Sequence, residues 1–402
     1  MKMSKFVKGG LAVVMAASLA ACGSSSTGSA SASGSADSGS GKKYVLGGSG
    51  PLTGDAAVYG LAVEHGAQIA VDEINAAGGK TQFDFVFEDD EADGEKATSA
   101  FNTLMDKGMQ VSLLTTTSGA GQTVAPLYQQ ENIFAITPSG SSPAIIYQDS
   151  DNETNPYGNV FQMCFTDPNQ GKASADYLAE HTDLGSKIAI IYRNDDNYSN
   201  GLYTKFKEEA SAKGLNIVDE EAFQDGTTDF SVYVQKAQAA GADIVFLPIY
   251  YQPASQILTA AKTAGYTPTF FGCDGMDGIL TMKGFDTSIA EGLYMLTPFA
   301  ADATDEKTQN FVKKYKDAYG ETPNQFAADA YDAVYALAQA LDASDVTPDS
   351  STDDITAALE EQFTSMKFDG ITGTSVTWNK NGEVSKDPKA IVIKDGAYVS
   401  AE

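Results

Sequence analysis

A repeated alternation of strand-like and helix-like segments is the feature that most constrains how this chain can fold. Tyr44–Ser49 has the pattern of a short strand, and apolar residues then recur at helical spacing over Leu61–Ala76, a run that stops at Gly78-Gly79. Further strand patterns, separated by helical ones, lie at Gln82–Glu88, Val111–Leu114 and Ile133–Ile136. Strands joined by helices in this way predict a parallel sheet covered on both faces.

The alternation restarts after Asp167. Helical patterns at Pro168–His181 and Gly201–Lys213 flank a strand-like Lys187–Tyr192, and strand and helix segments continue to Ala264. Long helices are predicted at 306–319, 325–342 and 352–366, and the segments 373–378 and 390–399 have strand patterns. Two blocks of this kind predict an α/β protein with two lobes rather than one oversized sheet.

The first residues have the features of an export signal. Three lysines precede an apolar stretch that is too short to span a bilayer and that ends in Leu19-Ala20-Ala21-Cys22. This ending resembles the lipobox of bacterial lipoproteins, so residues 1–21 are predicted to be a signal peptide that is cleaved before a lipidated Cys22. An ordinary secretory signal is the alternative. Residues 22–42, rich in Ser, Gly and Ala, are predicted to be a flexible tether to the extracytoplasmic face of the bacterial cell membrane.

The acidic composition disfavours one class of partner. The chain has 54 acidic and 26 basic residues, a net charge of −28, which repels nucleic acid and anionic lipid headgroups. No later apolar run is long enough to span a bilayer, so the lipid anchor is the only membrane contact that we expect. Cys164 and Cys273 are the cysteines that follow Cys22; their spacing leaves open whether they are bonded, and free thiols are favoured.

The motifs that usually mark enzymes are missing from the sequence. The chain has two histidines, His65 and His181, which are far apart and cannot by themselves support the common zinc sites. No phosphate-binding G-x-x-x-x-G-K-[ST] and no G-x-S-x-G occurs, and the glycines at 47–50 lack the third glycine of a dinucleotide fingerprint. The sequence therefore predicts neither catalysis, nor a cofactor, nor a metal.

Loops that follow predicted strands carry groups suited to an amino acid. Thr115–Ala120 joins a strand to the next helix, so its hydroxyl and N–H groups could receive a carboxylate at a helix N-terminus, or could simply cap that helix. Pro138–Pro143, rich in hydroxyl residues, follows another strand. Asp274, flanked by Gly272 and Gly275, could bind an ammonium group or could be a turn aspartate. Tyrosines at strand-to-helix junctions could form an apolar wall: Tyr59, Tyr198, Tyr250 and Tyr251.

Several motifs, in order from about Tyr44 to the C-terminus, resemble the branched-chain amino-acid-binding proteins of ABC importers. They are Gly50-Pro51-Leu52-Thr53-Gly54, Tyr59-Gly60, Gly66-Ala67-Gln68, Ala70-Val71-Asp72-Glu73-Ile74-Asn75, Cys164-Phe165-Thr166-Asp167, Gln170-Gly171, Asp229-Phe230-Ser231, Gly272-Cys273-Asp274-Gly275, Ala328-Asp329-Ala330-Tyr331-Asp332-Ala333-Val334 and Gly370-Ile371-Thr372-Gly373. The resemblance implies a type I periplasmic-binding-protein fold, with two Rossmann-like lobes of parallel sheet joined by three crossing segments. Lobe one is expected to comprise residues 43–162 and 298–372, and lobe two residues 163–297 and 373–402.

The resemblance also implies roles for individual residues. Ser118 is expected to bind the ligand's carboxylate, Ser139 to offer main-chain groups, Ser141 to place a hydroxyl between carboxylate and ammonium, and Asp274 to accept the ammonium. The side-chain pocket is expected to be shaped by Tyr59, Thr116, Thr117 and Phe326 from lobe one and closed by Tyr198 and Tyr251 from lobe two. The family often has threonine at the position of Ser141 and apolar residues or cysteine near Thr116-Thr117, so the hydroxyls at these positions disfavour a purely aliphatic pocket.

These expectations define one function and one alternative. The chain is predicted to be a monomeric solute-binding lipoprotein of an ABC importer, which captures an amino acid, branched-chain or aliphatic, by closing its cleft and delivers it to permease subunits. The alternative is a sensory module, or a receptor for another small amide or amino acid.

Overall fold

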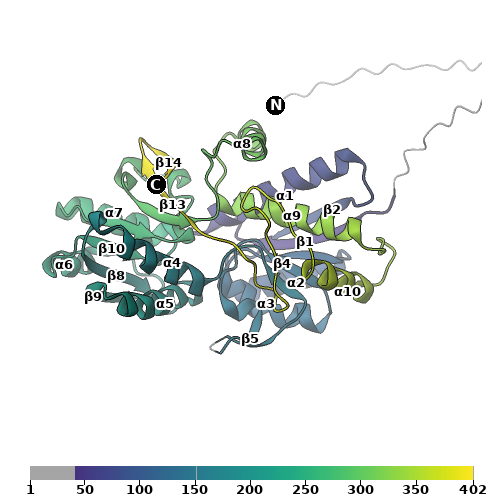
Figure 1. The fold of residues 1–402 in the computed structure, drawn as a ribbon, viewed down its shortest axis with the longest axis horizontal. Coiled ribbons are helices and arrows are strands. Elements are labelled where there is room, and N and C mark those ends of the chain that lie inside the picture. Colours follow the sequence, from purple (N-terminus) through teal and green to yellow (C-terminus); the bar gives the residue numbers. More distant parts are fainter. Residues whose placement is uncertain (1–40, 151, 402) are drawn as a thin grey trace, which may run out of the picture. The chain divides into compact units, whose positions relative to one another are not determined.

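The computed structural model describes residues 41–150 and 152–401, and within residues 42–402 the strands form two main sheets (Figure 1). The predicted signal peptide, Cys22 and almost all of the predicted tether lie outside the described residues. Within the described ranges, no helix has both the length and the apolar character needed to cross a membrane. Cys164 and Cys273 are buried free thiols.

The first sheet has five parallel strands in the order β2-β1-β3-β4-β7. The strands are β1 (Tyr44–Gly50), β2 (Phe83–Asp89), β3 (Val111–Thr115), β4 (Phe134–Thr137) and β7 (Val160–Gln162). β3 and β4 are buried along their whole length, as expected for a parallel sheet with helices on both faces. Side chains on one face belong to the same core cluster as those of α1 (Ala57–Ala77), α9 (Gln325–Ala343) and α10 (Thr352–Phe363). The other face packs against α2 (Gly94–Asp106) and α3 (Ser118–Gln130).

The second sheet has seven strands in the order β14-β13-β12-β11-β10-β8-β9. Its parallel strands are β8 (Lys187–Arg193), β9 (Asn216–Phe223), β10 (Ile244–Leu247), β11 (Thr269–Gly272) and β12 (Tyr294–Thr297). The hairpin of β13 (Lys389–Lys394) and β14 (Ala397–Ser400) adds two antiparallel strands at one edge. Core clusters join one face to α4 (Asp167–Glu180) and α5 (Asn197–Lys213), and the other to α6 (Ser231–Ala239) and α7 (Tyr251–Ala264). The predicted α/β fold with two parallel sheets is therefore confirmed.

The chain passes between the two sheets at three places. It leaves the first sheet after β7, returns after β12 to form α8 (Glu306–Tyr319), α9 and α10, and leaves again before β13. We call the first sheet with α1–α3 and α8–α10 lobe one, and the second sheet with α4–α7 lobe two. The residue boundaries of the lobes given above remain a prediction.

Some elements differ from the sequence prediction. The segment 373–378 is not a strand, because it makes isolated bridges only, between Val376 and Phe368 and between Trp378 and Val384. Its Trp378 indole instead donates a hydrogen bond to the carbonyl of Gln162, 2.8 Å away, where two crossing segments meet. The predicted strand 390–399 is a hairpin, which turns at Asp395-Gly396 with positive φ at both residues. The three-residue strands β5 (Tyr147–Asp149) and β6 (Thr154–Pro156) were not predicted.

Candidate functional site

A small cavity of about 10 Å³ lies between the lobes, at the carboxyl ends of strands from both sheets. This volume is far below the roughly 300–1,000 Å³ of typical ligand pockets, so the side chains of the two lobes nearly fill the space between them. Eleven residues line it: Tyr59, Thr116, Thr117, Ser118, Ser139, Ser141, Tyr198, Tyr250, Asp274, Gly275 and Phe326. The structure therefore brings nine of the ten predicted site residues to one cavity, and the exception is Tyr251.

The lobe-one side of the cavity is built where β3 turns into α3. Leu114 has a φ of 52° at the end of β3, where the pairing with β1 shifts register, so the backbone is strained at this point. The sequence pattern predicts a helix around Gln122–Gln130, but α3 begins four residues earlier, at Ser118, so the unpaired N–H groups of its first turn lie beside the cavity. The helix N-terminus and the hydroxyl residues around it favour an anion here.

Two hydroxyl groups hold the lobe-one loops together. The Ser118 hydroxyl accepts hydrogen bonds from the N–H groups of Ser141 and Ser142, both at 3.2 Å. The Ser139 hydroxyl donates to the carbonyl of Thr116 at 2.6 Å. Ser118 and Ser139 therefore fix the shape of the site as well as lining it.

Two other hydroxyl groups of this side have no partner among the described residues. They belong to Thr117 and Ser141, which are 5% and 1% exposed. A buried hydroxyl without a hydrogen bond is unfavourable by a few kcal/mol at most, about 1–3 kcal/mol from mutational data, and native proteins rarely leave one so. These two hydroxyls are thus available to a polar ligand in the cavity.

The lobe-two side of the cavity presents a carboxyl group. Asp274 follows β11 and accepts a hydrogen bond from the Tyr198 hydroxyl at 2.6 Å. Its own N–H donates to the side chain of Gln170, and its carbonyl accepts from Gln325 of lobe one. Burial raises the pKa of Asp274 to about 6, against hydrogen bonds from Tyr198 and Gln170 that lower it. Asp274 is the charged residue of the lining, so a cationic group on a ligand has one natural acceptor.

Aromatic rings form the rest of the wall. The Tyr59 ring lies 4.6 Å from that of Phe326 and 5.3 Å from that of Tyr250, and Tyr198 and Tyr250 are stacked at 4.9 Å. These centroid distances are typical of favourable aromatic pairs. Together the rings offer an apolar surface to a ligand side chain.

Tyr251 is not among the residues that line the cavity, whereas its neighbour Tyr250 is. Tyr251 is the first residue of α7, and its hydroxyl points to the N–H of Val58 at 3.4 Å, in a separate cleft at the edge of the lobes. Its N–H donates to the Tyr59 hydroxyl at 3.1 Å, and that hydroxyl in turn donates to the carbonyl of Gly275. Tyr251 thus contributes to contact between the lobes through its N–H, its hydroxyl and its ring, whose centroid lies 4.9 Å from that of the Tyr59 ring.

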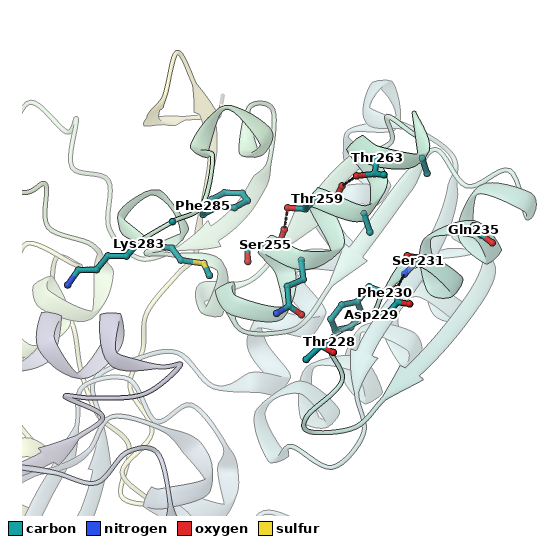
Figure 2. Close-up of a pocket in the computed structure, with 15 residues that line it drawn as sticks. Thr228, Asp229, Phe230, Ser231, Gln235, Ser255, Thr259, Thr263, Lys283 and Phe285 are labelled. Atoms are coloured by element: carbon teal, nitrogen blue, oxygen red, sulfur yellow. Dashed lines mark hydrogen bonds between the residues drawn. The ribbon is translucent and has the colours of Figure 1, made fainter.

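A larger hollow, of about 610 Å³, lies on lobe two alone (Figure 2). It is formed by α6, α7 and the segment from Met282 to Phe285. Its threonine hydroxyls bond back to their own helix, Thr259 to the carbonyl of Ser255 and Thr263 to that of Thr259, as the dashed lines in Figure 2 show. The smaller cavity is the stronger candidate for a site, because residues of both lobes line it and it combines the Asp274 carboxyl group with the unpartnered hydroxyls of Thr117 and Ser141. No group of three potential metal ligands was found among residues 41–150 and 152–401.

Comparisons with known proteins agree with this arrangement. A family model described as periplasmic binding protein matches residues 43–397. A leucine-, isoleucine-, valine-, threonine- and alanine-binding protein of Pseudomonas aeruginosa is 26% identical over 296 residues, which cover 73% of this chain and 76% of the relative. The branched-chain amino acid transporter substrate-binding protein LivJ of Streptococcus pneumoniae, solved with isoleucine, is 26% identical with a TM-score of 0.79, covering 90% of this chain and 99% of that one. An ABC transporter substrate-binding protein of Desulfitobacterium hafniense, solved with leucine, is 27% identical with a TM-score of 0.72, covering 90% and 100%.

Proposed function

This chain belongs to the periplasmic binding protein family, and we propose that it captures one amino acid with an aliphatic side chain between its lobes and delivers it to an ABC permease. The family binds substrates of ABC transporters, so the protein is a solute-binding protein and not an enzyme. Membership of the family also indicates an extracytoplasmic location.

The observation that carries the proposal is the polarity of the small cavity. Asp274 stands on lobe two, whereas the unpartnered hydroxyl of Thr117 and the first turn of α3 stand on lobe one. Among the described residues, no lysine or arginine lines the cavity. A zwitterion supplies an ammonium group for Asp274 and a carboxylate for the polar groups of lobe one, so it matches both sides of the cavity at once.

The apolar wall supports an aliphatic side chain. Tyr59, Phe326 and Tyr250 would cover it, and burial of such a side chain contributes roughly 1.5–3 kcal/mol. Relatives solved with isoleucine and with leucine fit the same choice. Micromolar affinity requires only about 8 kcal/mol in total, which this contribution and the polar contacts can supply together.

Closure of the lobes is the proposed mechanism of capture. The Tyr59 hydroxyl bonds to Gly275 and Tyr251 across the cleft, so the structure holds contacts that exist only when the lobes meet. A ligand that touches both lobes binds the closed form better and shifts the population toward it. The closed form then presents a surface that a permease can distinguish from the open one.

The predicted lipid anchor completes the proposal. Acylation of Cys22 would hold the protein at the membrane, and the tether of residues 22–42 would let a monomer reach its permease. Metabolic labelling with a palmitate analogue, compared between the wild type and Cys22→Ala, tests this part separately.

A binding screen tests the main proposal. The twenty L-amino acids and a set of small amides are screened by thermal shift, and those that stabilise the protein are titrated by calorimetry. We expect leucine, isoleucine or valine to bind, and Asp274→Asn to weaken that binding by about tenfold or more because an ionic hydrogen bond is lost. If no amino acid binds, or if Asp274→Asn binds every stabilising ligand as well as the wild type does, the proposal is wrong.

A further inference from the structure

A second carboxyl group is buried next to the cavity without being part of its lining. Asp167, the first residue of α4, is 0% exposed, and neither of its carboxyl oxygens has a hydrogen-bond partner among the described residues. Buried carboxyl groups are normally paired or hydrogen-bonded, because their charged form is costly to desolvate. An unpaired carboxyl group beside a binding cavity is therefore a candidate for a role in binding.

Ser141 connects Asp167 to the cavity. The N–H of Asp167 donates to the carbonyl of Ser141 at 2.9 Å, and Ser141 itself lines the cavity. The Ser141 hydroxyl lies near enough to the carboxyl group to lower the pKa of Asp167, although it makes no hydrogen bond of normal geometry. A small rotation of either side chain would let the serine donate its proton to Asp167 and turn its oxygen toward the cavity.

Among the described residues, no basic side chain forms an ion pair with Asp167. Burial is the main cause that raises the pKa of Asp167 well above its usual range, and the charges of Asp274 and of Asp196 raise it further. Tyr250, Cys164 and Cys273, which also interact with Asp167, are neutral acids whose pKa values burial likewise raises.

Two basic side chains of surrounding elements are engaged elsewhere. Arg193 forms ion pairs with Asp195 and Asp225, and Lys386 is paired with Asp329 at 2.6 Å. Asp167 and Asp274 therefore form a pair of buried carboxyl groups that makes no ion pair within residues 41–150 and 152–401.

From this geometry we infer that Asp167 is a positioning residue of the binding site. Its carboxyl group accepts a hydrogen bond from the Ser141 hydroxyl, and the Ser141 oxygen then faces the ligand's ammonium group. Together with Asp274 it restricts the site to ligands that carry a cationic group. The inference rests on the proposed function. It has a consequence for protons: the carboxyl pair retains a proton while the cavity is empty, and an entering ammonium group replaces that proton, which leaves for the solvent.

Calorimetry in two buffers tests this consequence. The probe is the amino acid that binds most tightly in the screen, beginning with leucine, titrated at pH 6 in phosphate and in a buffer of larger ionisation enthalpy. We expect the wild type to release a measurable fraction of a proton per ligand. In Asp167→Asn the release should fall, and the preference for leucine over 4-methylpentanoate, which has the same carbon chain without the amine, should narrow by about tenfold because one negative charge is lost.

Two further variants separate positioning from a general effect of burial. Asp90→Asn removes another fully buried carboxyl group whose pKa burial raises to about 6, but which bonds to Ser49 and Ala92 outside the lining. It should leave proton release and ligand preference unchanged. If Asp167 acts through Ser141, adding Asp167→Asn to a Ser141→Ala variant should change the preference for leucine over 4-methylpentanoate only a little further.

The possible results separate the role of Asp167 from the proposed amino-acid binding. Amino-acid binding without proton release by the wild type, or with an unchanged preference in Asp167→Asn, overturns the role of Asp167 and leaves the proposed function standing. The wild-type measurement decides this even if a variant does not fold. Failure of the wild type to bind any amino acid overturns both.

Discussion

Replacing Tyr59 by phenylalanine should weaken ligand binding by weakening closure of the lobes. The Tyr59 side chain is 2% exposed, its hydroxyl accepts from Tyr251 at 3.1 Å and donates to Gly275, and both partners belong to lobe two. The variant keeps the ring and its contacts with Phe326. Without the hydroxyl, the N–H of Tyr251 and the carbonyl of Gly275 lose this partner in the closed form, whereas the open form is unaffected.

The size of the effect follows from those two hydrogen bonds. A neutral hydrogen bond contributes about 0.5–1.5 kcal/mol net, so the closed form should lose about 1–3 kcal/mol relative to the open form. A ligand bound only by the closed form should then bind about 5–150-fold more weakly. The loss should appear in the dissociation constant, whereas the unfolding of each lobe should change little.

Calorimetric titration and thermal unfolding of the same samples provide the assay. Tyr44→Phe is the matched control, because the Tyr44 hydroxyl donates to the carbonyl of Val346 at 3.0 Å within lobe one. That variant should lose stability and keep its affinity. An affinity of Tyr59→Phe within twofold of wild type, or an equal loss in both variants, would refute the argument about closure.

Three other predictions concern charge and packing. Ligand affinity should fall as the pH drops below about 6, because burial raises the pKa of Asp274 to about 6 and protonation removes the acceptor of the ammonium; calorimetry from pH 5 to 8 measures this. Lys386→Met should destabilise the fold by about 3–5 kcal/mol in urea unfolding, because it leaves Asp329, 2% exposed and 2.6 Å from the lysine, as an unpaired buried group. Gly66→Ala should lower the free energy of unfolding by about 1–3 kcal/mol in the same assay, because its Cβ would lie 2.0 Å from the Ala327 carbonyl oxygen, where α1 packs against α9 (Figure 1).

Each of these predictions has its own contrary result. A flat affinity from pH 5 to 8 would mean that Asp274 is not the acceptor. Replacing both members of the ion pair, Lys386→Met with Asp329→Leu, should restore much of the stability, and a double variant as unstable as the single one would contradict the assignment. Gly119→Ala, where a Cβ meets nothing within 4 Å, is the control for Gly66→Ala and should be close to neutral.

The elements that could be predicted from the sequence are those with a clear hydrophobic periodicity within a short stretch of residues. Most strands and most helices follow local hydrophobic patterns, whereas the short strands β7 and β12 were not predicted. The start of α3 was missed because Ser118, Gly119 and Gly121 are poor helix formers, so the helical pattern begins only at Gln122. Tertiary contact decides that turn: a Cβ on Gly121 would lie 2.7 Å from the Ile145 side chain, so the glycine permits the close approach that keeps the helix there.

The site shows the same division. Residues that follow strands, such as Ser118 and Asp274, could be proposed because the carboxyl ends of parallel strands meet at one edge. The exchange of Tyr251 for Tyr250 could not be predicted, because successive residues at the start of a helix point in different directions. Asp167 and the pair of Lys386 with Asp329 depend on contacts between residues far apart in the chain, which no local pattern records.

A crystal structure of the complex with the best-bound amino acid tests the central claim most directly. We predict one ligand in the cavity between the lobes, its ammonium nitrogen within about 3 Å of an Asp274 carboxyl oxygen and its carboxylate on the loops of Ser118 and Ser141. A ligand in the hollow of lobe two shown in Figure 2, or one whose amino group lies away from Asp274, would contradict it.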